Sequence, residues 1–197
     1  MSKIAMLISS FLLAICLQST AQNSHKIGTQ VWMNENLNVK KFRNGDTIQQ
    51  AQSDEDWKKA GLNHTPAWCY NTLDSGLFNL RSVFYNRYAL YDKRGLAPQG
   101  WHIPSNKEWN VLISYFGGFA KAGYKFLQKK NLVGFNAVLA GWRDVGIGDI
   151  GEEGYWWSVN SSSLEDETEY FYIRKGNVVY NNRTNWLMGF SVRCVKD

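Results

Sequence analysis

The sequence predicts an α+β fold with a mainly antiparallel sheet of short strands and one or two packed helices, and three observations lead to this prediction. The first is a strong amphipathic helix pattern in the middle of the chain, and the second is a series of short apolar segments with strand composition around it. The third is the frequency of glycine, asparagine and aspartate between these segments, which is typical of turns. Hydrophobic residues make up 44% of the 197 residues and charged residues 20%, so the composition is that of a folded chain.

Residues 1–21 have the pattern of a secretory signal peptide. Lys3 supplies a positive charge, residues 4–17 carry no charge, and residues 19–21 are small residues at the expected cleavage site. As a helix, the uncharged run would rise about 21 Å, which is less than the roughly 30 Å of a bilayer core. We therefore expect cleavage after residue 21 and export of residues 22–197, as one domain without a transmembrane helix, to the periplasm, the cell surface or the medium.

The cysteine content follows from this expected cleavage. Cys16 would leave with the signal peptide, and lipidation of Cys16 is disfavoured because Ile15 is larger than the small residue that normally precedes a lipidated cysteine. The mature chain then keeps Cys69 and Cys194, and two cysteines in an oxidising compartment suggest a disulfide. Such a bridge would stabilise the fold by about 4–5 kcal/mol through loop closure, and two buried thiols are the alternative.

In the first half of the chain, the expected elements are short. Residues 27–33 have strand composition, and residues 44–46 (Asn-Gly-Asp) indicate a turn. A helix is expected over residues 53–61, capped by the serine at its start and stopped by the glycine at its end. Residues 67–70 are a further strand candidate, while residues 83–91 combine aromatic strand formers with helical spacing and fit either state.

The strongest local pattern predicts a helix that begins after Ser105. Ser105 and Glu108 form a capping box, in which each side chain binds the free backbone amide of the other residue. Apolar residues then recur at helical spacing, and they are Trp109, Leu112, Ile113 and Phe116. Two glycines at 117–118 end this helix, which is expected to pack with one face on the core.

After this helix, the sequence predicts mostly strands that are separated by turn residues. The expected strands cover residues 135–142, 155–159, 169–174, 178–180 and 189–195. Many short strands with few helices are typical of an α+β fold with an antiparallel sheet.

Eight short motifs occur in order along the chain: Gln30–Leu37 (QVWMNENL), Cys69-Tyr70, Pro98–Ser105 (PQGWHIPS), Glu108-Trp109, Phe135, Ala140–Arg143 (AGWR), Tyr155–Ser158 (YWWS) and Gly189–Asp197 (GFSVRCVKD). In this order they resemble the Fibrobacter succinogenes major paralogous domain, a family of exported proteins from Bacteroidetes-like bacteria. The resemblance covers about residues 27–197 and implies no established biochemical activity. The family often has a cysteine where this chain has Ala97, so its cysteine pairing does not carry over.

The start of the central helix and the segment Gly189–Cys194 also resemble, more distantly, formylglycine-generating sulfatase modifiers. This resemblance implies a C-type-lectin-like fold, and an analogy of fold does not assign a function. The modifier enzymes use cysteines at their active site, whereas Cys194 lies in the expected last strand of this chain.

Three patterns that suggest catalysis or a cofactor are set aside. Residues 146–151 match G-x-G-x-x-G, but a strand is expected after them where a dinucleotide site needs a helix. Glu152 with Glu165 or Asp166 would offer the two carboxylates of a glycosidase, but any acidic surface segment supports this equally well. His102, ahead of the helix cap, is interpreted as a hydrogen-bonded structural histidine, and no cofactor is expected.

The candidate binding residues lie in and beside two loops, at residues 144–154 and 181–187. Flat aromatic faces suit pyranose rings, and the candidate ligand-binding residues are Trp142, Arg143, Arg183 and Trp186. Trp186 is expected to be the most exposed tryptophan, whereas Trp32, Trp101 and Trp109 are interpreted as core residues. Four carboxylates offer oxygen ligands for a calcium ion, with a solvated loop as the alternative, and they are Asp144, Asp149, Glu152 and Glu153.

These features predict an exported or cell-surface module, without enzymatic activity, that binds glycan or an envelope protein through the two loops. An enzyme of the formylglycine-generating type and a purely structural envelope component are the alternatives.

The formal net charge of +5 falls to +4 when Lys3 leaves with the signal peptide. Because the basic residues are dispersed along the chain, nucleic acid is not an expected partner.

Overall fold

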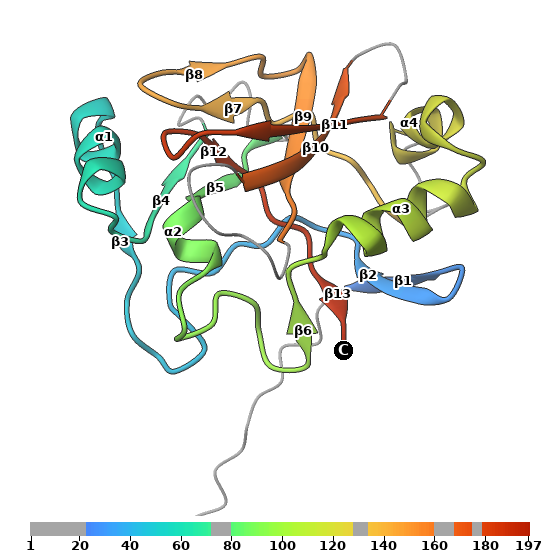
Figure 1. The fold of residues 1–197 in the computed structure, drawn as a ribbon, viewed down its shortest axis with the longest axis horizontal. Helices are drawn as coiled ribbons and strands as arrows, with labels where there is room; N and C mark the ends of the chain where they lie inside the picture. The colour runs from blue at the N-terminus through green and yellow to red at the C-terminus, as the bar shows by residue number, and fades with distance from the viewer. Residues whose placement is uncertain (1–22, 72–79, 128–133, 160–167, 175–178) are drawn as a thin grey trace, which may run out of the picture.

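The computed structural model describes residues 23–71, 80–127, 134–159, 168–174 and 179–197 (Figure 1). These residues form a mixed α+β structure with mostly antiparallel strands, which confirms the predicted α+β class. The described ranges contain four short helices, where the sequence predicts one or two. The expected signal peptide and Cys16 lie outside the described residues. No helix within the described ranges is long and apolar enough to cross a bilayer.

A four-stranded sheet brings the two ends of the described chain together, in the order β1-β2-β13-β6. Its strands are β1 (Ser24–Ile27), β2 (Gln30–Met33), β13 (Val195–Lys196) and β6 (Trp101–His102). Because β1 and β2 form an antiparallel hairpin, the single strand expected over residues 27–33 is wrong. Gly28 has a φ of 60° in the turn, which glycine adopts far more readily than other residues, and the chain reverses there.

A six-stranded sheet has the order β3-β4-β5-β12-β7-β8. Its strands are β3 (Gln49–Gln50), β4 (Ala67–Tyr70), β5 (Val83–Asn86), β12 (Gly189–Phe190), β7 (Trp142–Arg143) and β8 (Ile147–Gly148). β3 pairs with β4 in parallel, and the other neighbours are antiparallel. The third sheet is antiparallel and consists of β9 (Glu153–Trp157), β10 (Thr168–Arg174) and β11 (Val179–Thr184).

Two of the strands expected in the second half of the chain differ in the structure. Within residues 135–142 only the last residue belongs to a strand. Gly134, Asn136 and Gly141 have φ angles of 75°, 48° and 76°, which an extended strand does not accommodate. The expected strand 189–195 is divided into β12 and β13, which belong to different sheets.

The helices are α1 (Asp54–Leu62), α2 (Arg87–Leu90), α3 (Asn106–Tyr115) and α4 (Phe119–Leu127). α3 begins at the predicted capping box of Ser105 and Glu108. β5 continues directly into α2, which explains why residues 83–91 show both patterns. α1 is not stopped by Gly61, because it continues to Leu62, and α4 is not predicted from the sequence.

Aromatic side chains form much of the core between the sheets and the helix pair α3–α4. Trp109 of α3 packs against Trp32 of β2 with ring centroids 4.9 Å apart, and both side chains are fully buried, as the sequence predicts. Trp101 is half-buried and packs against a second apolar cluster that contains Phe190 and Cys194. Trp32 and Val195 thus anchor β2 and β13 in the core, and the chain segment that follows β2 forms part of the candidate site described below.

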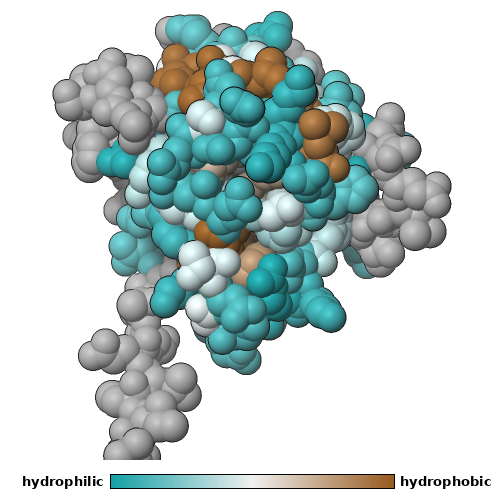
Figure 2. All heavy atoms as spheres, turned by 90° about the vertical axis from the view of Figure 1, so that its left-hand side faces the viewer, coloured by the Kyte–Doolittle hydropathy of each residue, from teal (hydrophilic) through white to brown (hydrophobic). Residues whose placement is uncertain are grey.

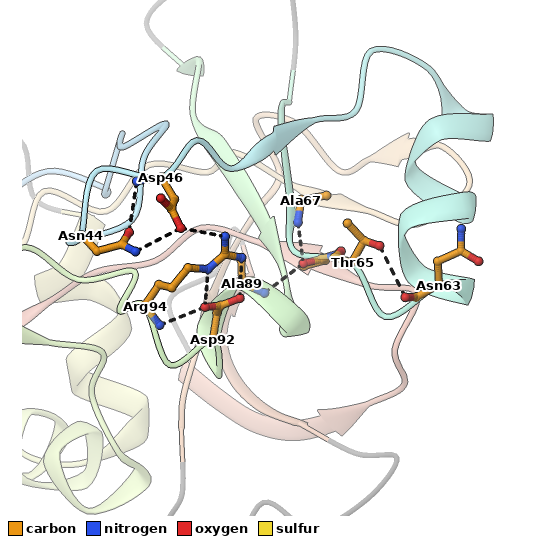
Figure 3. A network of polar contacts seen from close by, with 9 residues as sticks. Asn44, Asp46, Asn63, Thr65, Ala67, Ala89, Asp92 and Arg94 are labelled. Atoms are coloured by element: carbon orange, nitrogen blue, oxygen red, sulfur yellow. Dashed lines mark hydrogen bonds and ion pairs between the residues drawn. The ribbon is translucent and has the colours of Figure 1, made fainter.

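A polar network anchors the turn over residues 40–48. The amide of Ile48 donates to the carbonyl of Lys40 at 3.0 Å, which closes the turn. At its tip, the guanidinium of Arg94 lies 3.3 Å from Asp46 and 2.8 Å from Asp92 (Figure 3). The same guanidinium lies 4.1 Å from the ring centroid of Phe42, which is buried in the core. The turn that begins at Lys40 is therefore held by a backbone hydrogen bond at its base and by Arg94 at its tip.

Candidate ligand-binding cleft

A cleft of about 420 Å³, with polar and apolar walls, lies where the segment that follows β2 passes the ends of β4 and β5. In Figure 1 this segment is the blue chain that leaves β2 and crosses the middle of the molecule. The cleft is lined by Asn34, Glu35, Asn36, Leu37, Asn38, Tyr70, Arg81, Ser82, Val83, Asn136 and Val138. Amide and hydroxyl groups therefore make up much of its wall, with one aromatic ring and one guanidinium.

The segment 34–38 is fixed by the residues that connect β12 to β13. The amide of Met33 donates to the carbonyl of Cys194 at 3.0 Å, and the amide of Leu37 donates to the carbonyl of Val192 at 2.8 Å. The Leu37 side chain is buried in the core. Asn34, Asn36 and Asn38, which alternate around this anchor, line the cleft.

Asn36 joins the floor of the cleft to the core. Its Oδ1 accepts from Arg193 Nη2 at 2.6 Å and from Trp156 Nε1 at 2.9 Å. Its Nδ2 donates to Ser82 Oγ at 3.0 Å, and Ser82 Oγ lies 3.0 Å from Ser191 Oγ. Because all of these partners are buried side chains, the position of the Asn36 amide is set before any ligand arrives.

Arg193 lies directly beneath this floor and is fully buried. Its guanidinium donates to the carbonyl oxygens of Met33, Phe135 and Asn136 as well as to Asn36. Burial lowers the pKa of Arg193 to about 9, although the charge of Glu35 and Cys194 opposes this effect. Arg193 has no carboxylate in salt-bridge contact within the described residues, so its charge is balanced by carbonyl and amide dipoles.

Two cations flank the aromatic ring at the rim of the cleft. The Arg81 guanidinium lies 3.7 Å from the ring centroid of Tyr70. Lys40 Nζ lies 4.7 Å from the same centroid and 3.9 Å from that of Trp68. It also donates to Oδ1 of Asn38 at 2.7 Å. In the part of the chain that the structure describes, neither Lys40 nor Arg81 forms an ion pair.

Burial and, to a smaller extent, the neighbouring charge of Arg81 together lower the pKa of Lys40 to about 8, while Cys69 acts in the opposite direction. The structure therefore holds an amino group that is partly desolvated and repelled by a second cation. Among the residues that line the cleft, Glu35 is the one carboxylate, whereas glycosidases use two. The chemistry offered by the cleft is that of hydrogen bonding, ring stacking and charge.

The four ligand-binding residues predicted from the sequence lie elsewhere and do not line this cleft. Arg143 is buried, with 5% of its surface exposed, and its Nη2 donates to Ser53 and Asp54 at the start of α1. Trp142 Nε1 donates to Asp149 Oδ2 at 2.6 Å. Arg183 Nε donates to Glu169 at 3.0 Å on β10. Half of the expected loop 181–187 is in fact strand β11.

Trp186, which was expected to be the most exposed tryptophan, is half-buried, as are Trp101 and Trp142, whereas the other tryptophans are buried. Its ring covers Gly61 of α1, where an added Cβ would lie 2.7 Å from the ring carbons. A shallow groove of about 600 Å³ runs along α1, between Asp54 and Asn63, and reaches Val145. Figure 2 shows this face as mostly hydrophilic, with apolar atoms gathered at its top where the β7–β8 hairpin lies.

The four predicted calcium ligands have separate partners. Asp144 accepts from the amide of Gly146 at 2.9 Å, and Asp149 accepts from Trp142. Glu153 is buried and bonded to Tyr155 and Arg174, and Glu152 is exposed. Within the described ranges no group of three or more His, Cys, Asp or Glu side chains is arranged to hold a metal ion.

The two cysteines are free thiols in the structure, so the disulfide predicted between them is not formed there. Cys69 packs with Trp57 and Phe84, whereas Cys194 lies in a different apolar cluster with Phe190. Burial raises the pKa of both thiols to about 12. A nucleophilic cysteine acts as the thiolate, and this form is strongly disfavoured at both positions.

The cleft was missed because its walls come from segments that are far apart in the sequence. One signal was present, since Asn34, Asn36 and Asn38 alternate in a motif that stands among the family landmarks. In a comparison with protein families, the model described as Fibrobacter succinogenes major domain matches residues 26–196. Comparisons with curated proteins and with solved structures gave no match.

Proposed function

The chain belongs to the Fibrobacter succinogenes major domain family, and we propose that it is an exported, non-enzymatic module that binds a glycan in the cleft at Asn34–Asn38. The observation that carries the proposal is the fixed amide floor at Asn36 beside the ring of Tyr70. Ligand sites are typically concave, with a few convergent polar groups held in place by the scaffold.

The side chains of the cleft suit the surface of a sugar. Hydroxyl groups both donate and accept hydrogen bonds, and an asparagine amide offers both roles in one plane. Asn34 and Asn38 line the cleft on either side of Asn36, whose Oδ1 is held by Arg193 and Trp156, so the amides of Asn34 and Asn38 can bind sugar hydroxyls beside a fixed floor. Tyr70 adds an apolar surface against which the carbon face of a pyranose can pack.

Two further considerations support a binding role. The resemblance to C-type-lectin-like folds is an analogy, and such a scaffold would present its ligand site on irregular segments such as 34–38 and 136–138. A role in thiol chemistry would need a thiolate at Cys69 or Cys194, whose pKa values of about 12 oppose it. The binding role predicted from the sequence is therefore kept, and its site is moved to the cleft.

The test is retention of residues 22–197 on a panel of immobilised polysaccharides. We expect Asn38→Ala and Arg81→Ala to reduce retention at least tenfold, because each removes an exposed polar group of the cleft. Arg183→Ala, which removes an exposed side chain of β11, is the matched control and should retain the polysaccharide as the unmodified chain does.

The opposite result, with Arg183→Ala or Trp186→Ala impaired and the cleft variants unaffected, would return the site to residues 142–154 and 181–187. If none of the polysaccharides retains the unmodified chain, a glycan ligand is contradicted, and a protein partner or a structural role in the envelope is favoured. Each measurement is repeated with calcium and with EDTA. The cleft does not require a metal ion for its geometry, so loss of retention in EDTA would support calcium at Asp144–Glu153.

A further inference from the structure

We propose that the glycan bound in the cleft is acidic, with a carboxylate or sulfate group bound at the rim by Arg81 and by Lys40, the two cations that contact Tyr70. This inference rests on the proposed function and specifies the class of sugar. Neutral glycans can be bound by amides, hydroxyls and aromatic rings alone. The cleft provides these groups and, in addition, two cations at its rim.

The two cations are held close to each other by the same ring. Arg81 and Lys40 both lie within 5 Å of the Tyr70 centroid, at 3.7 Å and 4.7 Å. The charge of Arg81 helps to lower the pKa of Lys40, so the two cations repel each other, and the described residues provide no ion pair to either of them. A ligand anion would relieve this repulsion, and the planar guanidinium of Arg81 matches carboxylate and sulfate oxygens in pairs.

The charged side chains in and beneath the cleft are more often cations than carboxylates. Arg193 lies under the floor and bonds to Asn36, so a third cation acts on the cleft from below. Glu35 is the one carboxylate in the lining, and its side chain is exposed to solvent. Three cations and one carboxylate leave a local excess of positive charge, which favours an anionic ligand.

A specific pH dependence follows from Lys40, whose pKa is lowered to about 8. The titratable or charged groups that face Lys40 are Arg81 and Tyr70 at the rim and Cys69 on β4. An anion binds better to the protonated amine, so affinity for an acidic glycan should be highest below pH 8 and should fall as the pH rises through that value. In Lys40→Arg the guanidinium stays charged, and this fall should disappear.

The experiment measures the affinity of residues 22–197 for matched pairs of polysaccharides. The pairs are polygalacturonate with its methyl ester, and dextran sulfate with dextran, so that carboxylate and sulfate are tested separately. We expect at least tenfold tighter binding to one acidic member than to its neutral partner. Arg81→Gln should remove this preference, and Arg183→Gln, which removes the same charge from another surface, should keep it.

The outcomes separate this inference from the proposed function. Equal binding of acidic and neutral members would overturn the acidic ligand and leave the glycan-binding cleft intact. The preference for the acidic member could also fall equally in Arg183→Gln and in Arg81→Gln. That result would show attraction to the overall charge of the protein, and it would overturn the inference. Absence of binding to every polysaccharide, acidic or neutral, would overturn both proposals. Unchanged thermal unfolding of the variants confirms that they are folded.

Discussion

Arg193 is the residue on which the geometry of the cleft depends most directly. Its guanidinium donates to carbonyl groups on both sides of the cleft, Met33 on one segment and Phe135 and Asn136 on another, and to the Asn36 amide. A buried charge is costly unless its hydrogen bonds are satisfied, and here main-chain carbonyls satisfy them. In the sequence, Arg193 stands in an apolar segment with the composition of a strand, which gives no sign that it is fully buried.

His102 connects the end of the chain to α3. Its Nε2 lies 2.6 Å from Glu108 and its Nδ1 lies 2.7 Å from Asp197. Partial burial lowers the pKa of His102, but its hydrogen bonds to the two carboxylates raise it more, so the net shift is upward. For Glu108, burial raises the pKa, and the bonds from Ser105 and His102 lower it more. The interpretation of His102 as a structural histidine agrees with this geometry.

These two shifts give a prediction for the pH dependence of stability. The contribution of the charged imidazole is fully present below its unfolded pKa and is lost as the pH rises through the raised folded pKa. The contribution of Glu108 is lost only at a more acidic pH, so both groups stabilise the fold near pH 5–6. We expect His102→Gln to reduce the free energy of unfolding by about 0.2–1 kcal/mol there, because partly exposed ion pairs are weak.

The measurement for His102→Gln is urea unfolding at pH 5.5 and at pH 9. The difference between the variant and the unmodified chain should be larger at pH 5.5. A difference that is equal at both pH values would mean that the imidazole acts as a neutral hydrogen-bonding group and that the ion pairs add nothing.

At the scale of the elements, α3 was predictable and α4 was not, for a physical reason. The capping box and the apolar stripe of α3 are local, and Trp109, Leu112 and Ile113 are buried as expected. α4 has no comparable start signal, and it packs on α3 and on β11 after the chain has folded back. The expected strand 135–142 failed because its residues fit a strand by composition, while their backbone is bent at Asn136 and Gly141.

The contact between α1 and the turn at residues 186–187 shows why one element boundary was misjudged. A glycine near the end of a helix commonly marks its C-cap, and Gly61 was interpreted in this way. In the structure Gly61 lies within α1 because the Trp186 ring rests on its backbone. Trp57 fixes the same contact, since its Nε1 donates to the carbonyl of Leu187 at 2.8 Å.

Gly61→Ala is therefore expected to destabilise the protein although alanine favours helices. The gain in helix propensity is about 1 kcal/mol, whereas the new Cβ would lie 2.7 Å from the half-buried Trp186 ring. A cost of about 1–3 kcal/mol is typical of overpacking, so the net effect on the free energy of unfolding should be unfavourable. Chemical denaturation measures it.

The matched control for Gly61→Ala is the same substitution in a chain that also carries Trp186→Ala. Without the ring, the propensity gain should appear, and alanine should then stabilise the chain relative to glycine. Stabilisation by Gly61→Ala in the presence of Trp186 would show that the ring moves aside freely and that the contact does not shape α1.

For the molecule as a whole, the α+β class could be predicted and the candidate cleft could not. Strand composition, turn residues and the α3 pattern are local, and they indicate an α+β fold. The cleft combines residues 34–38, Tyr70, residues 81–83 and residues 136–138, and its floor depends on Arg193. No periodicity along the chain reports which of these segments meet. The loops favoured from the sequence contain prominent tryptophans, but Trp142 and Trp186 pack against Gly148 and Gly61 of the protein itself.

Binding of a glycan at Asn34–Asn38 can be tested directly by a nuclear magnetic resonance titration. Backbone amide signals of residues 22–197 are followed while an oligosaccharide of the best-retained polysaccharide is added. We expect the largest shifts at residues 34–38, Tyr70 and residues 81–83, together with a shift of the indole signal of Trp156, which donates to Asn36. Shifts confined to residues 142–154 and 181–187, with these signals unchanged, would contradict binding at this site.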